Sequence, residues 1–194
     1  MGKTIVVIEG HPDPDRNHLG YALTEAYRAG AEAAGHNVET VQVATLEFPL
    51  LRTQAEFEQG APPACIETVQ QAILRADHLL LEYPLWAGTM PALVKGFIEQ
   101  VFRPGFAIEA NDGGWPKRLL KGKSARIVVT MGMPAFVYRW YFGAHSLKSL
   151  ERNVLGLTGV SPIRECLIGG VDSMDEAARK RWLDLMHRYG TDAA

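Results

Sequence analysis

Three segments carry the side chains best suited to chemistry, and each follows an apolar run. The first is EGHPDPDRNHL, where Arg16, Asn17 and His18 offer hydrogen-bond donors just before an amphipathic pattern that begins at Leu19. The free backbone N–H groups at a helix start bind anions, phosphate above all. We therefore expect a phosphate site here. The structural alternative is that the PDPD stretch only forms turns.

The second segment, PLWAG, follows the apolar run Leu79–Tyr83. Pro84 cannot continue a central strand, so a loop should begin there. A large aromatic side chain such as Trp86, carried on a tight loop that ends at Gly88, suits a planar ligand, because backbone N–H groups can reach the polar edges of that ligand. The alternative is that Trp86 fills a gap between a helix and the sheet.

The third segment, TMGMPAFVYRWYFGAH, is unusually rich in aromatic residues for a loop. Core packing, an interface with a second copy of the chain, or a planar substrate would each explain this composition. Tyr138 and His145 are suitable proton donors to an oxygen that gains negative charge during a reaction. A lone histidine is nevertheless more often a helix-end or core residue.

The overall composition narrows the class of protein. The chain has 194 residues, 47% of them hydrophobic, and a formal net charge of −2, which argues against a general nucleic-acid binder or a polybasic membrane binder. No apolar run is long enough for a membrane span, and no signal peptide opens the sequence, so we expect a cytoplasmic protein. Cys65 and Cys166 form no C-x-x-C pair and are expected to be free, buried thiols.

Several common sites have no sequence support. The P-loop pattern, the G-x-G-x-x-G dinucleotide pattern and the G-x-S-x-G elbow of hydrolases are all missing. The six histidines show no metal-ligand spacing. We therefore expect no bound metal.

Five apolar runs alternate with helical patterns along the chain. This alternation predicts a single α/β domain over residues 1–194, with a parallel sheet of order 2-1-3-4-5 and helices on both faces. The order places the three segments described above on one rim of the sheet. The predicted strands are Thr4–Ile8, Asn37–Val43, Leu79–Tyr83, Ala125–Met131 and Pro162–Ile168.

Local signals predict where helices begin and end. Thr89 is the expected N-cap of the helix after the third strand, with Pro91 in its first turn. The capping box Ser173-x-x-Glu176 should start the last helix, and Gly190 should end it. Two long segments are expected to be irregular: Thr45–Pro63, and Arg103–Gly122 with its turn cluster NDGG.

In combination, these motifs resemble the flavodoxin-like NAD(P)H:quinone oxidoreductase family, which includes the ancillary flavoproteins of glutathione-gated potassium efflux systems. The resemblance covers nearly the whole chain and implies a flavodoxin-like three-layer sandwich. The motifs that carry it are His11-Pro12, Pro84-Leu85-Trp86, Pro91-x-x-x-Lys95-Gly96-Phe97-Ile98, Val101-Phe102 and Gly105-Phe106-Ala107.

The resemblance also implies which residues hold a flavin. FMN is favoured, because the short chain leaves little material to cover an adenosine, and FAD is the alternative. The implied cofactor-binding residues are His11, Arg16, Asn17, His18 and Leu19 near the phosphate, Pro84, Leu85, Trp86 and Ala87 along the ring, and Thr130, Met131, Gly132 and Met133 at the flavin edge. Backbone N–H groups of Met131 to Met133 would stabilise negative charge on the reduced ring. Tyr138 and His145 would be the catalytic proton relay, with Tyr141 as the alternative to Tyr138.

The implied activity is transfer of hydride from NAD(P)H through the flavin to a quinone, in a ping-pong sequence. The alternatives are a regulatory subunit of a potassium/proton antiporter, with a membrane transporter as its partner, and a flavodoxin-like electron carrier. We also expect a homodimer, because two apolar groups exceed what one sheet face needs. These groups are Phe97, Ile98, Val101, Phe102 and Phe106, and the aromatic residues of Phe136–Phe142.

Overall fold

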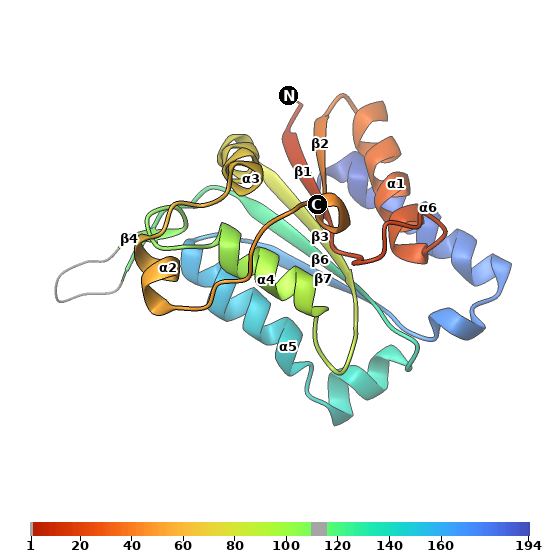
Figure 1. Ribbon diagram of the computed structural model, residues 1–194. Coiled ribbons are helices and arrows are strands. Elements are labelled where there is room, and N and C mark those ends of the chain that lie inside the picture. Colours follow the sequence, from red (N-terminus) through yellow and green to blue (C-terminus); the bar gives the residue numbers. More distant parts are fainter. Residues whose placement is uncertain (1, 110–115) are drawn as a thin grey trace.

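Five parallel strands form the centre of the molecule (Figure 1). The computed structural model describes residues 2–109 and 116–194. The sheet order is β2-β1-β3-β6-β7, so the predicted order 2-1-3-4-5 of the five main strands is confirmed. The strands are β1 (Thr4–Glu9), β2 (Asn37–Gln42), β3 (His78–Pro84), β6 (Ser124–Thr130) and β7 (Ile163–Ile168).

Helices cover both faces of this sheet (Figure 1). One face packs against α1 (Leu19–Ala33) and α6 (Glu176–Asp192). The other face packs against α3 (Ala64–Arg75), α4 (Ala92–Val101), α5 (His145–Lys148) and two π-helical segments, η2 (Val137–Tyr141) and η3 (Ser149–Gly156). Every residue of the central strand β3 is buried, which explains why this stretch is apolar apart from His78 and Glu82.

Three predicted helix ends are wrong. Helix α4 begins at Ala92 with Pro91 as its N-cap, because the backbone of Thr89 is already paired with Trp86. Helix α6 begins after Asp175, whose carboxylate accepts a hydrogen bond of 2.6 Å from the N–H of Ala178. The predicted cap Ser173 ends a short 3-10 turn, η4 (Val171–Ser173), and α6 continues past Gly190 to Asp192.

The two segments predicted as irregular contain short elements. The first begins at the last residue of a 3-10 turn, η1 (Val43–Thr45), and holds a short helix, α2 (Gln54–Gln59). The second holds an antiparallel pair, β4 (Ile108–Glu109) and β5 (Lys117–Arg118). The predicted turn cluster at residues 111–114 lies outside the described residues.

One of the two apolar groups expected at a dimer interface is not exposed. Phe97, Ile98 and Val101 are buried in the core between α4 and the sheet, and Phe102 and Phe106 are half-buried against that core. This half of the predicted patch is therefore wrong, because one chain already covers it. Both cysteines are free, with Cys166 buried and Cys65 half-buried. Across the described ranges, no helix is both long enough and apolar enough to cross a bilayer.

Candidate functional site

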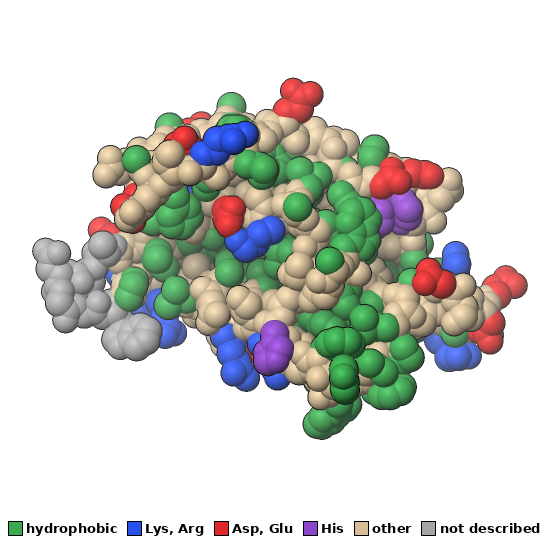
Figure 2. Space-filling model, turned by 60° about the horizontal axis from the view of Figure 1, so that its bottom comes forward, with side chains coloured by type: hydrophobic (Ala, Val, Ile, Leu, Met, Phe, Trp, Pro, Cys, Tyr) green, Lys and Arg blue, Asp and Glu red, His purple; other side chains and the backbone are tan. Residues whose placement is uncertain are grey.

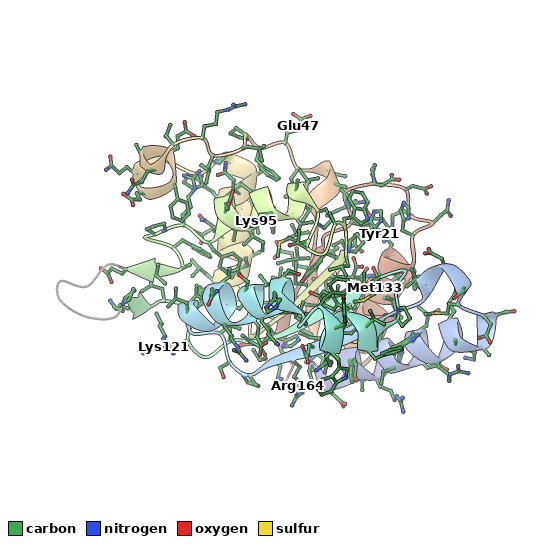
Figure 3. The ribbon with its side chains drawn as sticks, turned by 90° about the horizontal axis from the view of Figure 1, so that it is seen from below. Tyr21, Glu47, Lys95, Lys121, Met133 and Arg164 are labelled. Atoms are coloured by element: carbon green, nitrogen blue, oxygen red, sulfur yellow. The ribbon has the colours of Figure 1, made fainter. Side chains whose placement is uncertain are left out.

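The loops after β1, β3, β6 and β7 meet at the carboxyl end of the sheet and enclose a cleft of about 410 Å³. Figure 3 labels Tyr21 and Met133, from the segments that follow β1 and β6, at this end of the molecule. Clefts of this size at this place in an open α/β sheet hold small ligands. The cleft is lined by His11, Asp13, His18, Leu19, Gly20, Pro84, Leu85, Trp86, Thr130, Met131, Gly132, Val171 and Asp172.

The loop after β3 is a tight turn that fixes one wall of the cleft. Trp86 and Thr89 exchange two backbone hydrogen bonds of 2.8 and 2.9 Å around Ala87 and Gly88. Both central residues have positive φ, 47° and 79°, as the two-residue hairpin turns of type I′ require. A non-glycine residue at positive φ is strained, so the conformation of Ala87 has a slightly unfavourable free energy. This turn holds Trp86, which remains 50% exposed, beside the cleft.

The loop after β1 is held by side chains that bond its own backbone. The carboxylate of Asp13 accepts from the N–H of Asp15, and that of Asp15 accepts from the N–H of Asn17. The hydroxyl of Tyr21 donates to the carbonyl of Asp13 at 2.7 Å. The PDPD stretch therefore does form turns, as the structural alternative required, and these turns set the entry to α1.

Two histidines stack inside this loop. The rings of His11 and His18 are 3.8 Å apart and nearly parallel, and the ring of His11 meets Trp86 edge to face at 6.1 Å. Nε2 of His18 lies 3.0 Å from the carboxylate of Asp13. Burial lowers the pKa of His11. The N–H of Asp15 and then His18 lower the pKa of Asp13. His11 is thus a neutral aromatic wall at neutral pH.

The first turn of α1 leaves donors facing the cleft. His18 is the N-cap, and its side chain makes no capping hydrogen bond. Within the described residues, the backbone N–H groups of Leu19 and Gly20 have no acceptor. Arg16 points elsewhere: its guanidinium donates to the carboxylate of Glu9 at 2.7 Å and lies over the ring of Tyr21.

The loop after β6 offers fewer donors than predicted. The N–H of Met131 donates to the carbonyl of Ile168 at 2.9 Å, so it is already engaged. The N–H of Gly132 has no acceptor within the described residues. The carboxylate of Asp172 lies against Gly132, where a Cβ atom would come within 2.5 Å of its Oδ2. A negative charge therefore lies beside this edge of the cleft.

Neither member of the predicted relay lines the cleft. Tyr138 is buried, with its hydroxyl 2.8 Å from Oγ of Ser146 and accepting a bond of 3.3 Å from the N–H of Leu147. His145 is exposed at the start of α5, with its ring against Gly143. The structure gives Tyr138 a packing role within one chain.

The cleft brings together most, but not all, of the predicted cofactor-binding residues. Arg16, Asn17, Ala87 and Met133 lie outside its lining. Asp13, Gly20, Val171 and Asp172 also line the cleft, although no sequence motif assigns them to the cofactor. The pair Gly169-Gly170 directly after the fifth strand could have indicated a fourth rim loop, because it follows a strand of the same parallel sheet.

Comparison with known protein families gives one match over almost the whole chain. A family model described as flavodoxin-like fold matches residues 3–189. An oxidoreductase of Haemophilus influenzae, named as an uncharacterized NAD(P)H oxidoreductase, is 27% identical over 184 residues, which is 93% of this chain and 90% of that protein.

Two further proteins extend this comparison. A protein of Vibrio vulnificus named as an FMN-dependent NADH:quinone oxidoreductase is 29% identical over 147 residues, covering 72% of this chain and 68% of that protein. Among solved structures, an NAD(P)H:quinone oxidoreductase from Methanothermobacter marburgensis superposes with a TM-score of 0.81 over the full length of both chains, at 24% identity.

Proposed function

The chain belongs to the flavodoxin-like fold family, and on this premise we propose that it is a flavin-dependent NAD(P)H:quinone oxidoreductase with FMN as its cofactor. One observation carries the proposal. Four rim loops enclose a single cleft that has an aromatic wall at Trp86 and unpaired backbone donors at the start of α1.

The residues of the cleft fit FMN. The N–H groups of Leu19 and Gly20, with the imidazole of His18 beside them, suit the phosphate, because a helix start attracts anions. The segment Pro84–Trp86 offers an apolar surface for the flavin ring. Of the two flavins, FMN is the one named for the Vibrio relative.

The protein's own contribution is binding and positioning. When bound, FMN supplies the hydride chemistry that links NAD(P)H to a quinone in two half-reactions. The turn at Ala87 and Gly88, closed by two backbone hydrogen bonds, fixes the backbone that carries Trp86. The N–H of Gly132 can donate to the polar edge of the ring, while Asp172 limits how much negative charge that edge tolerates.

We also propose that two copies of the chain pair through the aromatic segment after β6. Phe136, Trp140, Tyr141 and Phe142 are exposed, with Trp140 at 81% and Tyr141 at 82%. In the view of Figure 2, apolar side chains form a protruding cluster at the lower right of the molecule. A second copy, related by a twofold axis, would bury this cluster beside the cleft and would complete the substrate site.

The test is direct titration of the purified protein with FMN, FAD and riboflavin, followed by anaerobic reduction with NADH or NADPH and reoxidation by a soluble quinone. We expect FMN to bind more tightly than riboflavin, because only FMN carries the phosphate. A protein that binds neither FMN nor FAD ends the proposal. Flavin binding without quinone reduction favours the electron carrier instead. The transporter partner and the cytoplasmic location stay predictions.

A further inference from the structure

A carboxyl group that the proposed chemistry does not use lies under the cleft. Glu82 is on the central strand β3 and is fully buried. Its Oε1 accepts a long hydrogen bond of 3.4 Å from the hydroxyl of Thr130. Its Oε2 has no partner among the described residues. A buried carboxylate without a cation is costly, so this group is expected to carry a proton.

Glu82 is separated from the cleft by very little protein. A Cβ atom on Gly20 would clash with both of its carboxyl oxygens, at 2.7 Å from Oε2. Gly20 and Thr130 both lie against this carboxyl group, and both line the cleft. Glu82 therefore lies directly behind the first turn of α1, where the free N–H groups are.

The groups around Glu82 leave its charge uncompensated. Glu9 is its register partner on β1, and that carboxylate is already bound by Arg16 and by the hydroxyl of Thr24, each at 2.7 Å. The remaining titratable groups that act on it within the described residues are the phenols of Tyr21 on α1 and Tyr83 on β3, both with raised pKa and so neutral.

We propose that Glu82 is a positioning residue that must be protonated for the start of α1 to hold the FMN phosphate. The inference rests on the proposed function for the place of the phosphate. A neutral carboxyl group behind Gly20 leaves the favourable field of the helix start intact. An ionised one opposes a phosphate dianion, because like charges in a poorly solvated site repel strongly.

The expected pH dependence follows from the direction of the pKa change. Burial raises the pKa of Glu82 to about 8, with the proximity of Glu9 acting in the same direction. Above this pH the free protein loses the proton that the complex keeps, so the affinity for FMN should fall. The fall is at most about tenfold per pH unit for one linked proton. Riboflavin lacks the phosphate, so its affinity should change little over the same pH range.

The experiment measures dissociation constants for FMN and riboflavin between pH 6.5 and 9 at constant ionic strength. The proteins are wild type, Glu82→Gln, and Glu67→Gln, which makes the same substitution at an exposed position on α3. We expect FMN affinity to fall at alkaline pH in wild type and Glu67→Gln, and to stay level in Glu82→Gln. Parallel curves for wild type and Glu82→Gln overturn the inference and leave the proposed function standing.

A second measurement needs no variant. Calorimetry at pH 8 in buffers of different ionisation enthalpy counts the protons taken up when wild type binds a flavin. We expect net proton uptake with FMN and none with riboflavin. Equal proton numbers for the two flavins contradict the inference even if Glu82→Gln does not fold. If FMN does not bind at any pH, it is the proposed function that fails.

Discussion

Two aromatic regions follow neighbouring strands of the sheet, and they are built in opposite ways. In the loops after β1 and β3, the ring of His11 contacts those of His18 and Trp86 within one chain. In the segment after β6, Trp140 and Tyr141 point away from the core. The aromatic side chains of the first region pack against one another, whereas those of the second remain exposed to solvent. Aromatic composition alone does not separate these two roles.

The backbone explains the difference. A two-residue turn with positive φ at Ala87 and Gly88 gives Trp86 one fixed direction. The segment after β6 coils as a π-helical turn, so successive side chains point around its axis. Tyr138 therefore faces the core, while Trp140 and Tyr141 face outward. One face of such a turn can pack against its own sheet, and the rest needs another surface.

The sharpest way to test the comparison is to remove one aromatic residue from each region. Trp86→Ala should weaken FMN binding about ten- to hundredfold, because loss of a stacked aromatic surface costs very roughly 1–3 kcal/mol. Trp140→Ala is the matched control and should leave FMN affinity within about twofold. Fluorescence titration measures both. An equal loss in the two variants contradicts the view that the wall is complete in one chain.

The next largest effect concerns the second region alone. Replacing Trp140 and Tyr141 together by serine should weaken self-association by about tenfold or more, because truncation of central interface aromatics typically costs over 1 kcal/mol. Sedimentation velocity across a range of protein concentrations measures this. The control is Leu74→Ser, which removes an exposed apolar side chain from α3. If the wild-type protein is a monomer at micromolar concentration, the proposed pairing is wrong.

The sheet was predictable because the residue types along a strand indicate how far that strand is buried. Leu79–Tyr83 is apolar on both faces except at Glu82, which is typical of a central parallel strand. The rim residues followed from topology, since parallel strands end at one edge. No local pattern marks Glu82, the fourth residue of that run, as a functional candidate. Its significance depends on Gly20 of another element, and no local pattern contains that contact.

The wrong predictions share a physical cause, which is competition between neighbouring structures. Thr89 is a good N-cap by type, but its backbone serves the turn with Trp86. Ser173 opens a capping box, yet Asp175 lies closer to the helix start. Phe97 and Val101 exceed what one sheet face was expected to need, yet both are fully buried in the core under α4. Sequence patterns give a residue's options, and tertiary contacts select among them.

A smaller effect should follow when Tyr138 loses its hydroxyl. In Tyr138→Phe the bonds to Ser146 and Leu147 disappear. Lost hydrogen bonds of this kind cost about 0.5–1.5 kcal/mol each, so thermal unfolding should occur a few degrees lower. Flavin affinity and both half-reaction rates should stay near wild type, since the hydroxyl lies outside the cleft. A selective loss of the quinone half-reaction with unchanged stability restores Tyr138 as a proton donor.

The smallest effect is expected for His145→Ala. The sequence suggested that His145 passes a proton to the quinone, in which case this variant should slow only reoxidation of the flavin, by about 10²–10⁴. In the structure the imidazole is exposed at the start of α5 and does not line the cleft. If a single chain forms the whole site, the rates of both half-reactions in His145→Ala should stay within about twofold of wild type, as for other surface substitutions.

Stopped-flow measurement of the two half-reactions separates these outcomes, and pairing of two chains gives it a further use. His145 lies close in sequence to the exposed aromatic residues, so a second copy that covers them can also change what His145 faces. If His145→Ala slows the quinone half-reaction of the dimer, and has no such effect when Trp140 and Tyr141 are both serine, His145 belongs to a site that two chains build together. An unchanged rate in both proteins leaves the catalytic groups to the cleft of one chain.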